Sequence, residues 1–132
     1  MIEVNNLTKE KIKAGFLIKI AQEVLRKEKR NLSIALVGEK RMKELNRKYR
    51  RKNRATDVLS FAQKEIGLGE IVLCPSQIKK NSRKFSITFI KELVKVLIHG
   101  ILHLQGYDHE KSEKEAKFME NKENYYLKLF FK

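Results

Sequence analysis

The three histidines of the chain lie within eleven residues of one another. His99 and His103 are four residues apart in an apolar stretch with a helical pattern, so both imidazoles should project from the same face, one turn apart. Gly106 then ends that helix and allows a sharp turn, after which His109 can return toward the other two rings. Imidazole nitrogens grouped in this way are typical zinc ligands. We therefore predict one catalytic zinc ion, Zn2+, held by His99, His103 and His109.

Three protein ligands leave one position of a tetrahedral zinc ion open to water, whereas a structural zinc site normally fills all four. Water at such a position can act as hydroxide near neutral pH, which predicts hydrolysis. The single thiol, Cys74, lies in a stretch with the pattern of a buried strand, so a closed structural site is harder to build. The alternative, ordinary core or surface histidines, fits their grouping around a helix end poorly.

The spacing H-x-x-x-H-x-x-G-x-x-H is that of the metzincin proteases, which carry a glutamate directly after the first histidine as general base. This chain has Gly100 there, so we expect no peptidase of that class. A base must then come from elsewhere or be the hydroxide itself. Metal-bound imidazoles usually donate their second N–H to a carboxylate or carbonyl. Asp108 and Glu92 are the candidates, although we interpret Glu92 as an ordinary solvated carboxylate.

A basic segment indicates the substrate. Residues 40–54 hold nine Lys and Arg side chains and one acid, in a chain whose net charge is +14. Such a density of positive charge favours binding to phosphate groups, because each contact releases counterions. The alternative is a solvated basic face, since Lys-rich proteins without a nucleic-acid role exist; we favour phosphate binding. The predicted RNA contacts are Arg47, Arg50, Lys52 and Arg54.

Hydrophobic patterns predict the elements that position these residues. Strands are expected over residues 1–5, 32–37, 57–62 and 70–74, the last two as antiparallel neighbours. Helices are expected over residues 8 to about 28, 42–49, 88–106 and 112–130, with a helical turn after Pro75. Thr8 is the expected N-cap of the first helix, and Ser112 with Glu115 forms a capping box for the last. The helix carrying His99 and His103 is apolar nearly all round and should be central and buried.

These elements make an α+β fold, a small mixed β-sheet packed with helices, which we expect as a single metal-dependent hydrolase domain over residues 1–132. One cysteine permits no intramolecular disulfide, which favours a reducing compartment. Residues 1–3 do not open a signal peptide, and the apolar run near 93–104 is too short to span a bilayer. We expect a cytoplasmic protein with no membrane partner and no small-molecule cofactor.

Three blocks of this sequence resemble the YbeY family, also called UPF0054, which are bacterial metal-dependent endoribonucleases of ribosomal RNA maturation. The blocks span about residues 45–109, and the general layout fits the whole chain. They read His-Gly-Ile-Leu-His-Leu-Gln-Gly-Tyr-Asp-His over 99–109, Leu-Asn-Arg-Lys-Tyr-Arg-Arg-Lys over 45–52 with Thr-Asp-Val-Leu-Ser-Phe over 56–61, and Gly-Glu-Ile-Val over 69–72.

The resemblance implies a zincin-like fold with the three motif histidines as zinc ligands. It implies that Arg50, which matches the family's Tyr-Arg pair, lies near the metal as a catalytic or phosphate-holding residue. It also implies cleavage of single-stranded RNA, 16S rRNA 3′-end processing, ribosome quality control and contact with the small ribosomal subunit. The sequence departs from the family at Asn53 and Ala55, where Asp and Pro are usual, and at Glu70, where Asp is usual. The first two could loosen the loop after Arg50.

Two rival functions stay open on the sequence. One is a metal-dependent hydrolase of another substrate, such as a peptide; Gly100 and the net charge of +14 count against it. The other is a non-catalytic ribosome-assembly factor that zinc merely stabilises; the open coordination position counts against it.

Overall fold

The computed structural model describes residues 1–63, 65 and 67–131. Its strands form one sheet in the order β1-β2-β4-β3. Neighbours β1 and β2 are parallel, as are β2 and β4, whereas β3 runs antiparallel to β4 with Ala62 opposite Gly69. The mixed sheet and the antiparallel β3–β4 pair are as predicted. The strands are β1 (Ile2–Asn6), β2 (Leu32–Leu36), β3 (Val58–Ala62) and β4 (Gly69–Leu73).

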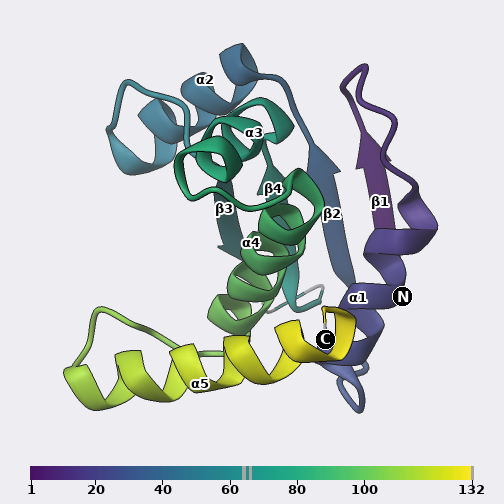
Figure 1. Ribbon diagram of the computed structural model, residues 1–132, viewed down its shortest axis with the longest axis vertical. Coiled ribbons are helices and arrows are strands. Elements are labelled where there is room, and N and C mark those ends of the chain that lie inside the picture. The colour runs from purple at the N-terminus through teal and green to yellow at the C-terminus, as the bar shows by residue number, and fades with distance from the viewer. Residues whose placement is uncertain (64, 66, 132) are drawn as a thin grey trace.

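Helices lie on both faces of this sheet. Figure 1 shows α4 crossing one face, with α1 and α3 beside it and α5 lying across its C-terminal end. The fold class, α+β with a central helix that carries the first two histidines, is therefore confirmed. Among the described residues, no helix is long and apolar enough to cross a membrane. The helices are α1 (Ala14–Leu25), α2 (Glu39–Arg50), α3 (Pro75–Lys84), α4 (Phe89–Leu104) and α5 (Glu113–Phe130).

Strand β4 separates two hydrophobic clusters, because successive side chains of a strand point to opposite faces. Ile71 and Leu73 join the main core beneath α1 and α4, whereas Val72 and Cys74 pack with Met42 of α2 on the other face. Cys74 is fully buried, as predicted, and burial raises the pKa of its thiol. Helix α4 is buried along most of its length, so its position against β3 and β4 is fixed by packing.

The start of α5 and the end of α4 match the predicted signals at Ser112 and Gly106, and the structure adds a cap at Thr88 that was not predicted. The Thr88 hydroxyl accepts a hydrogen bond from the backbone N–H of Lys91, and the Ser112 hydroxyl accepts one from the N–H of Glu115, both at 3.1 Å. Gly106 follows α4 with a φ of +101°, a backbone conformation that favours glycine. The segment between the two helices, which carries His109, is therefore anchored at both ends.

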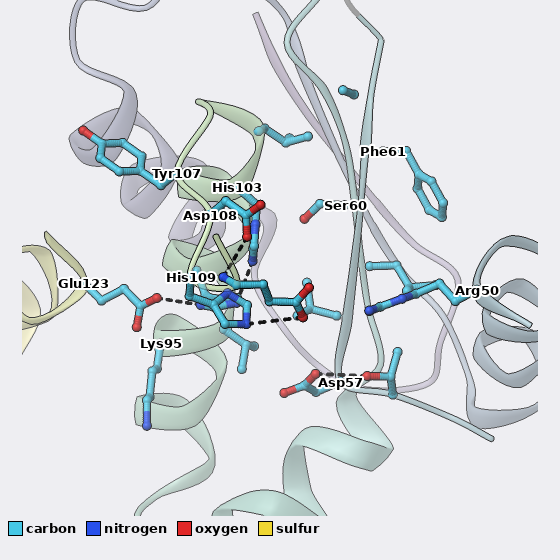
Figure 2. Close-up of a pocket in the computed structure, with 18 of the residues that line it drawn as sticks. Arg50, Asp57, Ser60, Phe61, Lys95, His103, Tyr107, Asp108, His109 and Glu123 are labelled. Carbon is cyan, nitrogen blue, oxygen red and sulfur yellow. Dashed lines mark hydrogen bonds and ion pairs between the residues drawn. The ribbon is translucent and has the colours of Figure 1, made fainter. Parts of the chain in front are cut away.

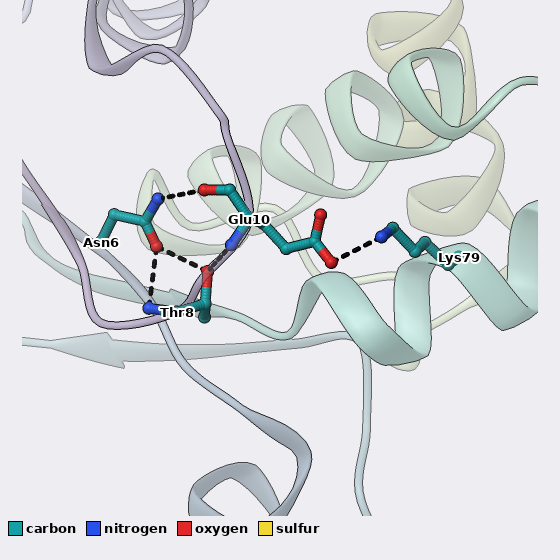
Figure 3. Close-up of polar contacts among 4 residues, drawn as sticks. All are labelled: Asn6, Thr8, Glu10 and Lys79. Carbon is teal, nitrogen blue, oxygen red and sulfur yellow. Dashed lines mark hydrogen bonds and ion pairs between the residues drawn. The ribbon is translucent and has the colours of Figure 1, made fainter.

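The prediction of Thr8 as a helix N-cap is wrong, and α1 begins only at Ala14. The Thr8 hydroxyl donates to Asn6 Oδ1 at 2.7 Å and accepts from the N–H of Glu10 at 3.1 Å (Figure 3). Threonine hydroxyls close local turns as readily as they cap helices, and here the turn prevails. The helix also ends at Leu25 rather than near residue 28, because Arg26 has a positive φ of 44°.

Candidate active site

The three histidines converge at the C-terminal end of α4 (Figure 2). His99 and His103 come from successive turns of the helix, and His109 returns after the turn at Gly106. One ring nitrogen of each histidine lies within 4.8 Å of the others, and Nε2 of His99 is 3.0 Å from Nε2 of His103. Two nitrogen ligands of a tetrahedral zinc ion stand about 3.4 Å apart, given Zn–N bonds of about 2.1 Å. The donor set therefore fits a divalent metal that prefers imidazole.

The surroundings of His103 favour its neutral form. Burial lowers the pKa of His103, and the neighbouring imidazoles of His99 and His109 lower it further. The carboxylates of Asp108 and Glu123 oppose this shift only in part. His103 therefore stays neutral near pH 7, with a nitrogen lone pair available to a metal.

Glu123 supports the cluster from α5. Its Oε1 accepts a hydrogen bond from Nδ1 of His99 at 2.6 Å (Figure 2), which leaves Nε2 of that ring facing the other two histidines. Sequence reasoning missed this residue. A signal was present, because Glu123 lies four residues after Met119, the buried residue of α5, and so shares its inward face.

Asp108 and Glu92, the predicted acceptors of a histidine N–H, have other roles and surroundings in the structure. Oδ1 of Asp108 accepts from the backbone N–H of Glu110 at 2.9 Å, which shapes the turn before α5. Glu92 lies two turns before His99 on α4, about 10 Å away along the helix. It is not a solvated carboxylate, as we had interpreted it: its side chain is only 2% exposed.

The carboxyl group of Glu92 is buried with incomplete hydrogen bonding among the described residues. Its Oε1 has no hydrogen-bond partner within the described part of the chain. Burial raises the pKa of its carboxyl, the Asp57 carboxylate raises it further, and the Lys95 ammonium opposes both. Its position in the first turn of α4 favours a negative charge, because the helix dipole is positive there.

Gly100 faces the sheet. A Cβ at this position would lie 3.2 Å from Oγ of Ser60 and 3.3 Å from Cγ2 of Val58, tighter than ordinary contact. Oγ of Ser60 also donates to the Gly100 carbonyl at 3.2 Å and so ties β3 to α4. A glutamate at position 100 would need the sheet to move away, which explains why the metzincin base has no room here.

A groove of about 960 Å³ runs between α4 and β3, with the histidines on one side. Arg50, the last residue of α2, lines the same groove. Figure 2 shows its guanidinium on the opposite side from the histidines and turned toward them. The structure therefore brings together the predicted metal ligands and the predicted phosphate-holding arginine.

The side chain of Asn46 anchors the loop after Arg50. Nδ2 of this buried side chain donates to the Arg54 carbonyl at 2.8 Å. The loop leaves α2 through Arg51, which has the left-handed φ of 58° that commonly ends a helix. These two features turn the chain back toward β3 and keep Arg50 at the mouth of the groove.

The other predicted RNA contacts lie outside the groove. Arg47 lines a separate hollow of about 510 Å³ on α2, together with Lys48 and Tyr49. Lys52 and Arg54 are exposed on the loop, and neither lines a pocket found among the described residues. If RNA contacts these three residues, it does so beyond the groove.

Three imidazoles at one side of a groove and an arginine at the other are the arrangement of a metal-dependent hydrolase acting on an anionic substrate. Residues 2–130 match the model of the family described as Endoribonuclease YbeY. The chain belongs to this family, which confirms both the predicted family and the predicted class of enzyme.

Similar proteins support the assignment over nearly the full length. An Endoribonuclease YbeY of Thermosipho melanesiensis is 39% identical and is aligned over 100% of this chain and 96% of its own. One of Thermotoga neapolitana is 44% identical over 80% of this chain and 72% of its own. The solution structure of a Thermotoga maritima protein, 41% identical, superposes with a TM-score of 0.73 over 96% of this chain and 87% of that one.

Proposed function

We propose that the chain is a zinc-dependent endoribonuclease that cleaves single-stranded RNA in the groove between α4 and β3. The observation that carries the proposal is that three histidine nitrogens and the Arg50 guanidinium face one another across one groove. Membership of the endoribonuclease family supports RNA as the substrate. A groove of about 960 Å³ can admit an unpaired strand, whose bases and phosphates are accessible together.

Zinc bound by His99, His103 and His109 would supply a Lewis acid and a water of lowered pKa. Arg50 would bind the scissile phosphate from the opposite side, since a guanidinium matches two phosphate oxygens at once and offsets the charge that develops during attack. Glu123 would act through His99, by fixing its tautomer and ring orientation. Gly100 has no side chain that could accept a proton.

We extend the proposal to the biological setting implied by the family resemblance. The chain would act in 16S rRNA 3′-end processing and ribosome quality control in the cytoplasm, with the small ribosomal subunit as its partner and residues 1–132 as one hydrolase domain. The exposed basic side chains Arg47, Lys52 and Arg54 support contact with RNA beyond the groove. A long, structured substrate would use such contacts, whereas a short oligonucleotide would not.

The test is cleavage of a 16S rRNA fragment that extends past the mature 3′ end. We expect zinc-loaded protein to cut the unpaired segment, a chelator to abolish cutting, and added zinc to restore it. His103→Ala should bind less metal and lose cleavage, with its circular dichroism spectrum unchanged. Binding of zinc and of the small subunit without any cleavage would instead favour the non-catalytic assembly factor. Cleavage of peptides but not RNA would favour a hydrolase of another substrate.

A further inference from the structure

An exposed aromatic stack lies beside the groove, on the side of α5. Tyr107 follows the turn at Gly106, and Phe118 lies in the second turn of α5. Their ring centroids are 5.7 Å apart and their planes are inclined by 19°, so the rings are stacked. Tyr107 packs against the main core, whereas the Phe118 side chain is 55% exposed. The exposed ring of Phe118 is therefore held against the ring of Tyr107, which the main core supports.

This stack is continuous with the catalytic groove. A hollow of about 490 Å³ lies between the end of α4 and the start of α5, and Phe118 forms part of its wall. Gly106, Tyr107 and Asp108 line both this hollow and the groove. Figure 2 shows the Tyr107 ring turned away from the histidines, toward the side from which Glu123 comes. A strand that leaves the groove past the histidines thus meets the stack next.

Charges of both signs surround the stack, and its lysines can contact the backbone of such a strand. Lys114 is one turn before Phe118 on α5 and lines the same hollow, and Lys117 is exposed beside it. Two carboxylates, Asp108 and Glu115, also line the hollow; Asp108 accepts the backbone N–H of Glu110, and Glu115 is exposed to solvent. A flat aromatic ring with positive side chains nearby is an arrangement that proteins use to bind unpaired nucleotides, with the base on the ring and the phosphates on the cations.

We propose that the Tyr107–Phe118 stack is a nucleotide subsite, at which an unpaired base of the RNA substrate stacks on Phe118 while Lys114 and Lys117 contact the adjoining phosphates. The proposal rests on the proposed function, because it extends the RNA path beyond the scissile phosphate. The subsite contacts the flat face of a base by stacking. It therefore favours a single strand over a duplex and tolerates any base.

The test uses the absence of tryptophan from this sequence. Phe118→Trp places the sole indole of the protein at the subsite, where base stacking quenches its fluorescence. Leu129→Trp is the matched control, since Leu129 is exposed on the last turns of the same helix and lies outside the hollow. We expect a single-stranded RNA oligonucleotide to quench the first indole and not the second. An oligonucleotide with one abasic position over the subsite should restore the signal.

Affinity separates stacking from simple apolar contact. Phe118→Leu keeps an apolar side chain without an aromatic face, and we expect it to bind the single strand about tenfold more weakly than the wild type. Phe118→Trp should bind at least as tightly as the wild type. A Phe118→Leu variant with full RNA affinity, or an indole that RNA does not quench, would overturn the subsite and leave this face to an apolar protein partner.

The same measurements separate this proposal from the proposed function. If the wild type cleaves the 16S fragment while Phe118→Leu binds and cleaves like it, the subsite is wrong and the nuclease stands. If RNA quenches Phe118→Trp but no cleavage occurs with zinc bound, the subsite stands and the nuclease is wrong. A wild type that binds no single-stranded RNA overturns both.

Discussion

The two sides of the groove are held in place by different means. On the histidine side, α4 is buried in the core and capped at its start by Thr88, and Glu123 of α5 orients His99. On the Arg50 side, the arginine is exposed at the end of α2, before an exposed loop that Asn46 ties down. A metal site needs fixed nitrogens, whereas a phosphate clamp can adjust to a bound strand.

We therefore expect the histidine side to determine metal binding and the Arg50 side to determine how RNA is bound and cleaved. Substitutions on the histidine side should change both metal content and cleavage. Those on the Arg50 side should change cleavage while the metal stays bound.

Among variants that keep the metal, the largest effect should come from Arg50→Ala. Because the guanidinium offsets charge on the phosphate under attack, kcat/KM for RNA should fall by about 100- to 1,000-fold. Zinc content, measured by atomic absorption, should equal that of the wild type. Arg50→Lys should recover only part of the loss, since an ammonium group cannot hold two phosphate oxygens in one plane.

Arg83→Ala is the matched control, because Arg83 is exposed at the end of α3 and lies outside the groove lining. It should cleave like the wild type. If Arg50→Ala lost zinc in parallel with activity, the two sides of the groove would not be independent.

Glu123→Gln should weaken zinc binding by about 10- to 100-fold, the usual cost of losing a carboxylate partner of a metal-bound histidine. Competition with a coloured chelator measures the affinity directly. Glu120→Gln, an exposed position on the same helix, should bind zinc like the wild type. Equal zinc affinity for Glu123→Gln and the wild type would show that α4 alone fixes the His99 ring.

The sequence predicts the histidine cluster well because its geometry is local. Four residues along a helix and one glycine turn determine where the three rings lie, whatever else the chain does. Glu123 comes from a helix whose crossing over α4 depends on tertiary packing, so its pairing with His99 could not be read from spacing. Arg50 was identified through the family resemblance and the basic segment, not through geometry.

The two errors have different origins. Thr8 has the pattern of a helix N-cap, but its hydroxyl donates to Asn6 and accepts from Glu10 in a local turn instead. Glu92 has the charge of a solvated residue, but it lies on the face of α4 that is packed into the protein. Close neighbours in the sequence therefore decided the outcome for Thr8, whereas tertiary packing, which spacing cannot reveal, decided it for Glu92.

Asn46→Ala tests how firmly the Arg50 side is held. The variant loses the hydrogen bond to the Arg54 carbonyl and leaves a small cavity, so we expect the free energy of unfolding to fall by about 1 to 2 kcal/mol. Urea unfolding measures this change. RNA cleavage should fall less than in Arg50→Ala, because the arginine is displaced rather than removed, and zinc binding should not change.

Asn53→Ala provides the control on the exposed loop itself, and its stability should match that of the wild type. An Asn46→Ala variant with wild-type stability and cleavage would show that the Arg51 turn alone places Arg50.

Glu92→Gln tests a buried and poorly compensated group on the histidine side of the groove. Because burial raises the pKa of Glu92 in the folded protein, its neutral form contributes stability below the ordinary glutamate pKa. That contribution is lost as the pH rises through the raised, folded-state pKa. Glutamine stays neutral throughout, so the variant should gain stability relative to the wild type as the pH rises, by on the order of 1 kcal/mol at pH 8.

Urea unfolding of both proteins between pH 4 and pH 8 gives this difference directly. The charges that face Glu92 are Lys95 and Asp57, and both are retained in the variant, so the difference isolates the Glu92 proton. Glu120→Gln removes an exposed carboxylate and should show no such trend. A Glu92→Gln variant that loses stability as the pH rises would mean that the Lys95 ammonium outweighs burial, and that the first turn of α4 is held by an ion pair rather than strained by one buried charge.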